Sequence, residues 1–561
     1  MPAMRLILIP AAAICWLAIV PETRPPVIVR NGLVATSQPL ASAAGLRVLQ
    51  EGGNAVDAAV TAAAVLSVTE PTMTGVGGDL FAIVFDAKSG KLSGLNASGR
   101  APSKATLDAF RSRGLSEIPV GGPLSVSVPG AVDGWAELLQ RFGTKTLARV
   151  LEPAITYARD GYAVTPIIAG QWQSAEDRLA KDPAAAATFL VGGRAPRAGE
   201  VFANPKLAAT LQAIARGGRD AFYRGPLAQA IAADMAKREG FLTAEDLAAH
   251  RSDWVEPIST SYRGHQVHEL PPNTQGFAAL EMLNILEAYD IAALGHNTAA
   301  YLHLLVEAKK IAYADRDAYL ADPGSVPNDL LRRLISKEYA AERRKEINLS
   351  KAGTYAPAGK ASESGDRANN PLGAAPRPLA SGDTVYLTAA DQHGNVISLI
   401  QSLFNTFGAG IVAGDTGIAL HNRGSLFSLS PSHPNVIGPG KRPFHTLVPG
   451  MVMKDGRPWL SFGVMGGDHQ AQGHVQVLLN LIDFKMDVQA AGDAPRFNHG
   501  AGLALEDGIP EEVRVKLTAL GHRLAEPGGT HGGYQGILID PRTKALSGGS
   551  DRRKDGVAVG Y

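Results

Sequence analysis

The feature that most constrains this chain is a low-complexity segment followed directly by an apolar strand. Residues 351–383 are rich in Ala, Gly and Pro and contain a single aromatic residue. They cannot bury enough apolar area to offset the entropy of ordering, so we expect them to be mobile. Residues 384–390 (TVYLTAA) follow at once and have the composition of a buried strand. This junction is a suitable place for proteolytic processing.

Cleavage between Asp383 and Thr384 would give Thr384 a free α-amine beside its own hydroxyl. An α-amine has a pKa of about 7.7–8.0, so near neutral pH a useful fraction accepts the hydroxyl proton. Nucleophile and base then belong to one residue. The sequence therefore predicts an Asp383–Thr384 cleavage site and a Thr384 nucleophile. The alternative is that Thr384 is an ordinary first residue of a strand.

The register of a predicted hairpin supplies Thr384 with a neighbour. A turn at residues 391–395 leads into a second strand, residues 396–404. If Ala390 pairs with Val396, the same register puts Ser402 opposite Thr384, within hydrogen-bonding reach. A β-bulge would change this register. Ser402 is thus predicted to be a supporting hydroxyl, against the alternative of a plain cross-strand hydrogen bond.

Acyl chemistry also needs donors that stabilise an oxyanion. Gly466 and Gly467 follow the predicted strand 459–464 and precede a predicted helix at 472–482. Two small residues there can present adjacent backbone N–H groups to a substrate carbonyl. Taken alone, a Gly-Gly pair is more often a tight turn.

Composition and spacing exclude several other classes. Net charge is +1 with dispersed Lys and Arg, so a nucleic-acid partner is not expected. The single cysteine, Cys15, lies near the N-terminus, which excludes thiol catalysis in the rest of the chain. Asp468, His469 and His474 do not have metal-ligand spacing, and the glycine-rich residues 74–79 precede a strand instead of joining a strand to a helix. No cofactor or metal is expected.

Residues 1–22 resemble a targeting leader. Arg5 precedes an apolar stretch, residues 6–21, which is short for a membrane span and contains Pro10. We expect a signal peptide and a periplasmic or secreted protein. An uncleaved anchor remains open, as does a mis-assigned start codon, which would make the protein cytoplasmic. No other integral membrane role is expected.

The remaining pattern indicates a mixed α/β protein. Residues 54–68 are apolar nearly all round, which predicts a buried helix, and residues 80–95 read as a β-hairpin. Residues 132–344 are chiefly helical. Further strands are expected at 417–420, 451–453 and 459–464.

Ten short blocks in order give the chain a resemblance to a known family. It resembles the gamma-glutamyltransferase family of N-terminal nucleophile hydrolases over nearly everything after residue 31. The blocks are SQPLAS (37–42), EGGNAVDAA (51–59), TGVGGD (74–79), SVPG (127–130), GDT (382–384), DQHGN (391–395), FGAGI (407–411), PGKRP (439–443), MGG (465–467) and AVGY (558–561).

The resemblance implies a four-layer αββα sandwich. It implies autocatalytic cleavage into a large subunit, residues 23–383, and a small catalytic subunit, residues 384–561, which stay together as an intertwined heterodimer. Thr384 matches the family nucleophile, Ser402 its supporting hydroxyl, and Gly466-Gly467 its oxyanion donors. The implied reaction cleaves an amide of a small molecule through an acyl-threonine intermediate, by hydrolysis or by transfer to another amine.

The positions that recognise glutamate in typical members are changed here. Ser98 stands where the family has the Arg that holds the substrate α-carboxylate, and Arg100 lies two residues further on. Leu426 replaces the Asp that pairs with the α-amine. Three further positions differ from the family. Phe404 stands in place of an Asn and Arg423 in place of a Gln. The pair His445-Thr446 stands in place of a Ser-Ser pair.

Compared with typical family members, this set of residues still contains positively charged side chains, but it lacks the negatively charged Asp at position 426. Because an unpaired charge in a closed pocket is costly, it favours a substrate with a carboxylate but no adjacent ammonium. We predict Arg100, Arg423, His445 and Thr446 as substrate-binding residues. A gamma-glutamyl amide, a glutaryl-type amide and an oxamate-like amide stay open, with hydrolysis favoured over transpeptidation. A catalytically inactive scaffold and an uncleaved structural protein are the remaining alternatives.

Overall fold

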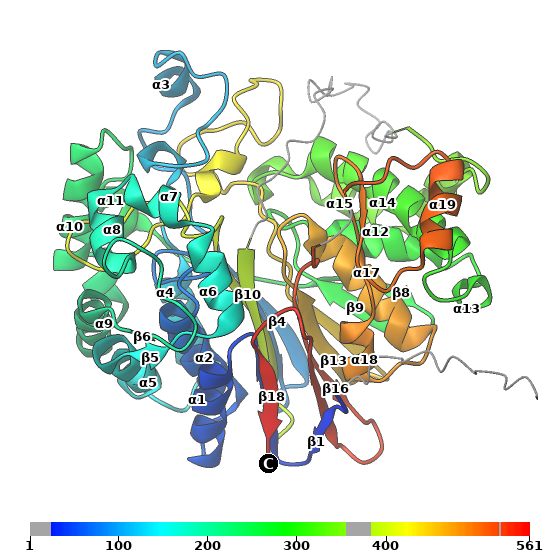
Figure 1. Ribbon diagram of the computed structural model, residues 1–561, viewed down its shortest axis with the longest axis horizontal. Coiled ribbons are helices and arrows are strands. Elements are labelled where there is room, and N and C mark those ends of the chain that lie inside the picture. The colour runs from blue at the N-terminus through cyan, green and yellow to red at the C-terminus, as the bar shows by residue number, and fades with distance from the viewer. Residues whose placement is uncertain (1–23, 355–382, 527–528) are drawn as a thin grey trace, which may run out of the picture.

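The computed structural model describes residues 24–354, 383–526 and 529–561. Two seven-stranded antiparallel sheets pack face to face, and helices cover the outer face of each (Figure 1). The first sheet has the order β18 (Val557–Gly560), β2 (Gly32–Thr36), β10 (Asp383–Asp391), β11 (Val396–Phe404), β3 (Asp79–Asp86), β4 (Lys91–Ala97) and β7 (Asp253–Val255).

The second sheet contributes the other inner layer. Its order is β1 (Val27–Val29), β17 (Leu546–Ser550), β16 (Tyr534–Ile539), β13 (Arg457–Val464), β12 (Gly450–Lys454), β9 (His265–Glu269) and β8 (Ile258–Tyr262). Strands β10 and β11 pack across the interface on β13, and β10 also packs on β16. The predicted αββα fold class is confirmed.

Helices form the two outer layers. The first sheet is covered by α1 (Pro39–Gln50), α2 (Ala55–Thr69) and α4 (Ala131–Phe142), with α5 (Leu147–Asp160) and α9 (Pro205–Tyr223) packed outside them. The second is covered by α12 (Gly276–Leu286), α17 (His469–Ile482) and α18 (Val488–Asp493), with α14 (Ala299–Tyr319) packed on α12. None of the helices in the described residues combines the length and apolarity needed to cross a membrane.

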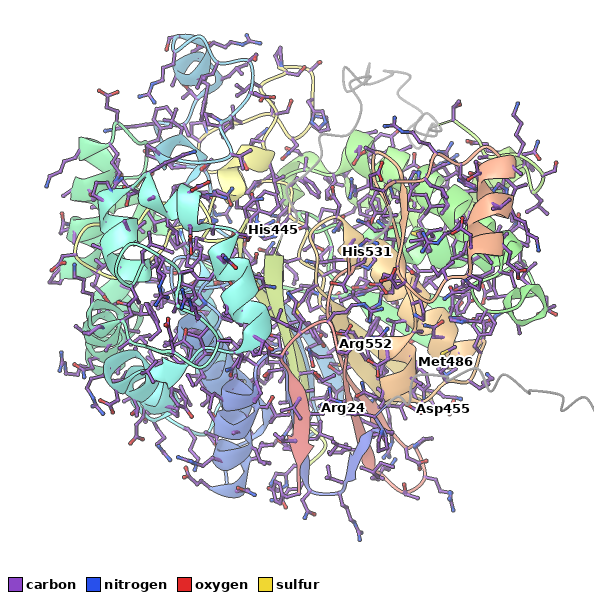
Figure 2. All side chains as sticks on the ribbon, in the orientation of Figure 1. Arg24, His445, Asp455, Met486, His531 and Arg552 are labelled. Carbon is purple, nitrogen blue, oxygen red and sulfur yellow. The ribbon has the colours of Figure 1, made fainter. Side chains whose placement is uncertain are left out.

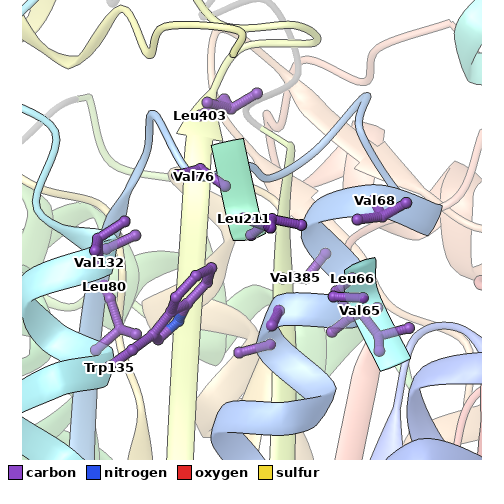
Figure 3. Close-up of a cluster of buried hydrophobic side chains, with 14 of the residues drawn as sticks. Val65, Leu66, Val68, Val76, Leu80, Val132, Trp135, Leu211, Val385 and Leu403 are labelled. Carbon is purple, nitrogen blue, oxygen red and sulfur yellow. The ribbon is translucent and has the colours of Figure 1, made fainter. Parts of the chain in front are cut away.

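Helix α2 supports the middle of the first sheet. Every one of its residues is buried, as expected for a sequence that is apolar nearly all round. Its N-terminus is a capping box, in which Asn54 and Asp57 satisfy each other's backbone N–H groups. The helix packs on β10 and β11, and Figure 3 shows Val65 and Leu66 of α2 close to Val385 of β10.

Most other elements expected from the sequence are present, with one correction. The hairpin at 80–95 is β3 and β4, and strands 451–453 and 459–464 lie within β12 and β13. Residues 417–420 are not a strand: they form only isolated bridges, Gly77 with Leu420 and Val412 with Ala419. Gly417 has a positive φ of 71°, which breaks the extended run. The predicted leader and most of the 351–383 segment lie outside the described residues.

Candidate active site

The pairing of β10 with β11 determines what lies beside Thr384. The predicted register holds from Ala390↔Val396 to Val385↔Gln401. It then shifts, and the next pair is Asp383↔Phe404. Two residues of β11, Ser402 and Leu403, therefore oppose Thr384, which is a β-bulge at the site where the register mattered most.

The bulge does not separate the two hydroxyls. Thr384 Oγ1 donates to Ser402 Oγ across 3.4 Å and accepts from Gln470 Nε2 at 3.4 Å. Ser402 Oγ in turn accepts from the N–H of Phe404 at 2.7 Å. Gln470 is fixed from its other end, because its Oε1 accepts from the N–H of Val448 at 2.9 Å. Thr384 is 1% exposed in the intact chain, so its hydroxyl is held between two oriented side chains.

Gly466 and Gly467 form the turn between β13 and α17. Their φ values are 111° and 58°, a region that favours glycine. Their carbonyls are occupied: Gly466 accepts from the N–H of His469 at 3.0 Å, and Gly467 accepts from Gln275 Nε2 at 3.0 Å. Neither N–H donates a hydrogen bond to any described residue. The pair is thus braced through its carbonyls while its two donors stay available, as an oxyanion site requires.

Gln275 joins this turn to the next part of the site. Its Nε2 also donates to the carbonyl of Thr446 at 2.9 Å, and its Oε1 accepts from Arg316 Nη1 at 2.7 Å. One buried amide therefore fixes the spacing between the Gly466-Gly467 turn and the segment that carries His445 and Thr446.

Three of the four predicted substrate-binding residues lie in one buried cluster around Asp79. Arg423 Nη1 donates to Thr446 Oγ1 at 3.0 Å. His445 Nε2 lies 3.0 Å from Asp79 Oδ2, and His421 Nδ1 lies 3.2 Å from the same oxygen. Arg423 Nε is 3.9 Å from it. Since Ser402 pairs with Asp79 in the β11–β3 register, the cluster adjoins the strand next to β10.

Burial affects the charges of Arg423 and His445 differently. Burial lowers the pKa of His445 to about 3 and that of Arg423 to about 9. At neutral pH the imidazole is therefore uncharged and the guanidinium charged. Burial by itself raises the pKa of Asp79, but hydrogen bonds and electrostatic interaction with the imidazoles of His421 and His445 outweigh it and hold that pKa well below its ordinary value. The guanidinium of Arg423 stacks 4.3 Å from the centre of the Phe404 ring.

Arg100 does not join this cluster. Its Nη2 forms an ion pair with Asp253 at 2.9 Å, its Nη1 donates to the carbonyl of Gly440 at 3.2 Å, and its side chain is 37% exposed. The cation that reaches Ser98 is instead Arg442, whose Nη1 donates to Ser98 Oγ at 3.2 Å. The structure thus places Arg100 in a partly exposed ion pair outside the Asp79 cluster.

One trio among the described residues has donors close enough for a metal ion. Ligand atoms of His303, Glu307 and His522 lie within 4.8 Å of one another. Each already has a protein partner: His303 Nδ1 is 2.7 Å from His522 Nε2, and Lys310 Nζ donates to Glu307 at 2.6 Å. The trio is satisfied without an ion.

Sequence reasoning missed four residues that organise the site. Asp79 is the last residue of the TGVGGD block, and His421 lies two residues before Arg423. Their positions next to singled-out residues could have marked them as candidates. Gln470 and Gln275 sit in or next to helices with no distinguishing pattern. Their roles depend on contacts between segments far apart in the chain.

Comparison with known proteins places this geometry in a family. The family model described as gamma-glutamyltranspeptidase matches residues 41–561. The chain belongs to the gamma-glutamyltranspeptidase family.

Members of the gamma-glutamyltranspeptidase family similar to this chain have more than one described activity. A "Glutathione hydrolase-like YwrD proenzyme" of Bacillus subtilis is 40% identical, over 95% of this chain and 99% of the relative. An "Acylase ACY 1 proenzyme" of Pseudomonas is 38% identical, over 94% and 93%. The crystal structure of a cephalosporin acylase from Bacillus halodurans superposes with a TM-score of 0.89 at 42% identity, covering 99% of both chains. The chain is thus an amide hydrolase or transferase of this family.

Proposed function

We propose that the chain is a proenzyme cleaved between Asp383 and Thr384, and that Thr384 then hydrolyses amides through an acyl-threonine ester. The freed α-amine takes the hydroxyl proton as Thr384 Oγ1 attacks the substrate carbonyl carbon. The resulting oxyanion accepts hydrogen bonds from the N–H groups of Gly466 and Gly467. The C–N bond breaks as the leaving amine takes the proton, and water then hydrolyses the ester. The fragments ending at Asp383 and beginning at Thr384 remain associated.

The observation that carries this proposal is the position of the Thr384 hydroxyl. It lies at the start of a central strand, between Ser402 and Gln470, and next to the expected processing segment. A buried strand end of this kind holds a new N-terminus rigidly. The word "proenzyme" in the names of both relatives above agrees with this reading.

For the acyl group we propose one that carries a carboxylate and no adjacent ammonium, as in glutaryl-type or oxamate-like amides. Arg423 supports this, because its Nε and Nη2 have no hydrogen-bond acceptor among the described residues although the side chain is fully buried. A substrate carboxylate provides such acceptors. Asp79, the nearest carboxylate, is already shared by two histidines. The gamma-glutamyl amide is the second candidate, favoured by the name of the Bacillus subtilis relative.

The test is intact mass under denaturing conditions for the wild type and Thr384→Ala, followed by activity on glutaryl and γ-glutamyl anilides. We expect two fragments divided before Thr384 in the wild type only, and faster release from the glutaryl anilide. Faster γ-glutamyl release would replace the proposed acyl group by glutamate. A wild type that stays uncut after long incubation would refute the mechanism.

A further inference from the structure

A second compartment lies beside the oxyanion turn. A cavity of about 760 Å³ has Gly466 in its wall, together with residues of α14, of the start of α17 and of the loops near residues 500 and 530. Its described walls do not include Arg423, His445 or Thr446. Figure 2 labels His531, which lines the cavity, and His445 of the Asp79 cluster, and both lie near the same end of the two sheets.

Lys309 of α14 is the unusual group in this wall. Its side chain is 4% exposed, and its Nζ lies 4.0 Å from the centre of the Tyr313 ring and 3.4 Å from His499 Nδ1. No carboxylate of the described residues lies within 4.0 Å of it. A buried ammonium group without a carboxylate partner is rare, because its desolvation is not compensated.

The other charges around the cavity are largely paired. Arg316 forms ion pairs with both Asp317 and Asp468, so these three side chains together carry one net negative charge. Arg553 is paired with buried carboxylates behind the wall. Lys554 also lines the cavity and forms no ion pair with any described residue. With both lysines protonated the wall is therefore net positive by about one charge, and the N-terminal end of α17 adds to that potential.

We propose that this cavity binds a carboxylate carried by the amine portion of the amide substrate, with Lys309 as its main contact and Lys554 as a second. This inference rests on the proposed function. If the acyl carboxylate occupies the Arg423 side, the other substituent of the reacting carbon must leave by another route. The cavity provides one, since it meets the oxyanion turn but not the acyl cluster. The favoured leaving groups are amino acids, peptides or aromatic amines that bear a carboxylate.

A matched pair of substrates tests the proposal. Amides of one acyl group with 4-aminobenzoate and with 4-aminobenzamide differ in a single negative charge on the leaving amine. We expect the wild type to prefer the 4-aminobenzoate amide in kcat/KM. Lys309→Met should lower that preference ratio roughly tenfold or more, the usual effect of losing a buried charged contact. Lys516→Met is the charge-matched control, because Lys516 is an exposed residue of α19 (Glu511–Ala519) and does not line the cavity. It should keep the wild-type ratio.

A second measurement separates this inference from the proposed function. Benzoate binding, followed by calorimetry, needs no catalysis. We expect binding to the wild type and its loss in Lys309→Met. A wild type that binds benzoate but cleaves neither amide would refute the proposed function and leave the anion site standing. Two results would each overturn the anion site. One is a preference ratio that Lys309→Met leaves unchanged because both amides lose activity equally. The other is a wild type that does not bind benzoate.

Discussion

Ser402 and Thr384 show how much of the chemistry depends on single atoms. The bulge leaves Ser402 Oγ in contact with Thr384 Oγ1, while the N–H of Phe404 fixes the serine oxygen from behind. An oxygen that is oriented in this way accepts a hydrogen bond from the threonine hydroxyl without rearrangement. Glycine at 466 and 467 is needed for a different reason, since both φ values are positive.

Replacing Ser402 by Ala should therefore slow both processing and turnover. We expect kcat to fall roughly tenfold, the effect of one hydrogen bond to a reacting group, with a smaller change in KM. Fragment appearance on a denaturing gel and steady-state kinetics measure the two effects. Ser398→Ala is the matched control, because Ser398 lies buried on the same strand and bonds Tyr386 instead. Equal effects in both variants would mean that Ser402 is only structural.

Lys309 makes the unfolding free energy of the protein depend on pH. Burial lowers its pKa to about 7 from an ordinary value near 10.5. Below about pH 7 the lysine is charged in both folded and unfolded chains, and burying the charge costs stability in full. Between about pH 7 and 10.5 the unfolded chain binds more protons, so the unfolding free energy rises with pH. Lys309→Met removes this term.

In the uncleaved Thr384→Ala background, we expect Lys309→Met to be more stable than its parent at pH 6. The difference should shrink steadily as the pH rises from 7 toward 10. Urea unfolding at each pH measures it, with Lys516→Met in the same background as control. A difference that does not depend on pH would show that the lysine is not titrating as its burial requires.

At the scale of the element, helix α2 lies beneath β10 and is fixed at its N-terminus by Asp57. Asp57 caps the helix by accepting from the N–H of Asn54, and it also accepts from the N–H and hydroxyl of Thr144 and the N–H of Lys145. One carboxylate thus ties the start of α2 to the loop before α5. The helix has no exposed face that would tolerate its displacement.

Asp57→Ala should destabilise the protein by about 3 kcal/mol, because several buried donors lose their acceptor at once. Urea unfolding of the Thr384→Ala chain measures this. Asp108→Ala, at an exposed first-turn position of α3 (Leu107–Arg111), should change stability by less than about 0.5 kcal/mol. A similar small change in Asp57→Ala would contradict the role of the cap.

The sequence predicts elements better than it predicts contacts between them. The apolar run of α2 and the β10–β11 hairpin are local signals, and both elements form where expected. The bulge at Thr384 shifts the register between Asp383 and Val385, and no local sequence pattern marks that position. The ion pair of Arg100 with Asp253 brings together residues 153 positions apart, which no local pattern encodes. Lys309 likewise lies in an ordinary helical pattern, and only the packed structure shows that it lacks a carboxylate.

At the scale of the whole molecule, the proposed cleavage divides the sheets between two chains without dividing the fold. Strand β2 lies between β18 and β10, so a strand from before the cleavage site is paired on both edges with strands from after it. In the second sheet, β12 comes from after the cleavage site and pairs on one edge with β9, which comes from before it. Neither fragment therefore has a complete sheet of its own.

We expect the two fragments to co-elute in size-exclusion chromatography under native conditions and to separate in denaturant. After removal of denaturant, uncleaved Thr384→Ala should recover its native elution volume and circular dichroism. The cleaved wild type should recover much less, because each fragment exposes unpaired strand edges before it meets the other. Equal recovery in both would show that the fragments fold independently.

The position of β2 between β18 and β10 has a further consequence under the proposed cleavage. Before cleavage, folding is a first-order event within one molecule, and its equilibrium does not depend on how much protein is present. After cleavage, the unfolded state is two chains that diffuse apart, so recovery becomes second-order and the folded fraction depends on concentration. Dilution then acts as a denaturing variable alongside heat and urea. We therefore expect the cleaved protein at low concentration to persist through a slow rate of unfolding, and not through a reversible equilibrium.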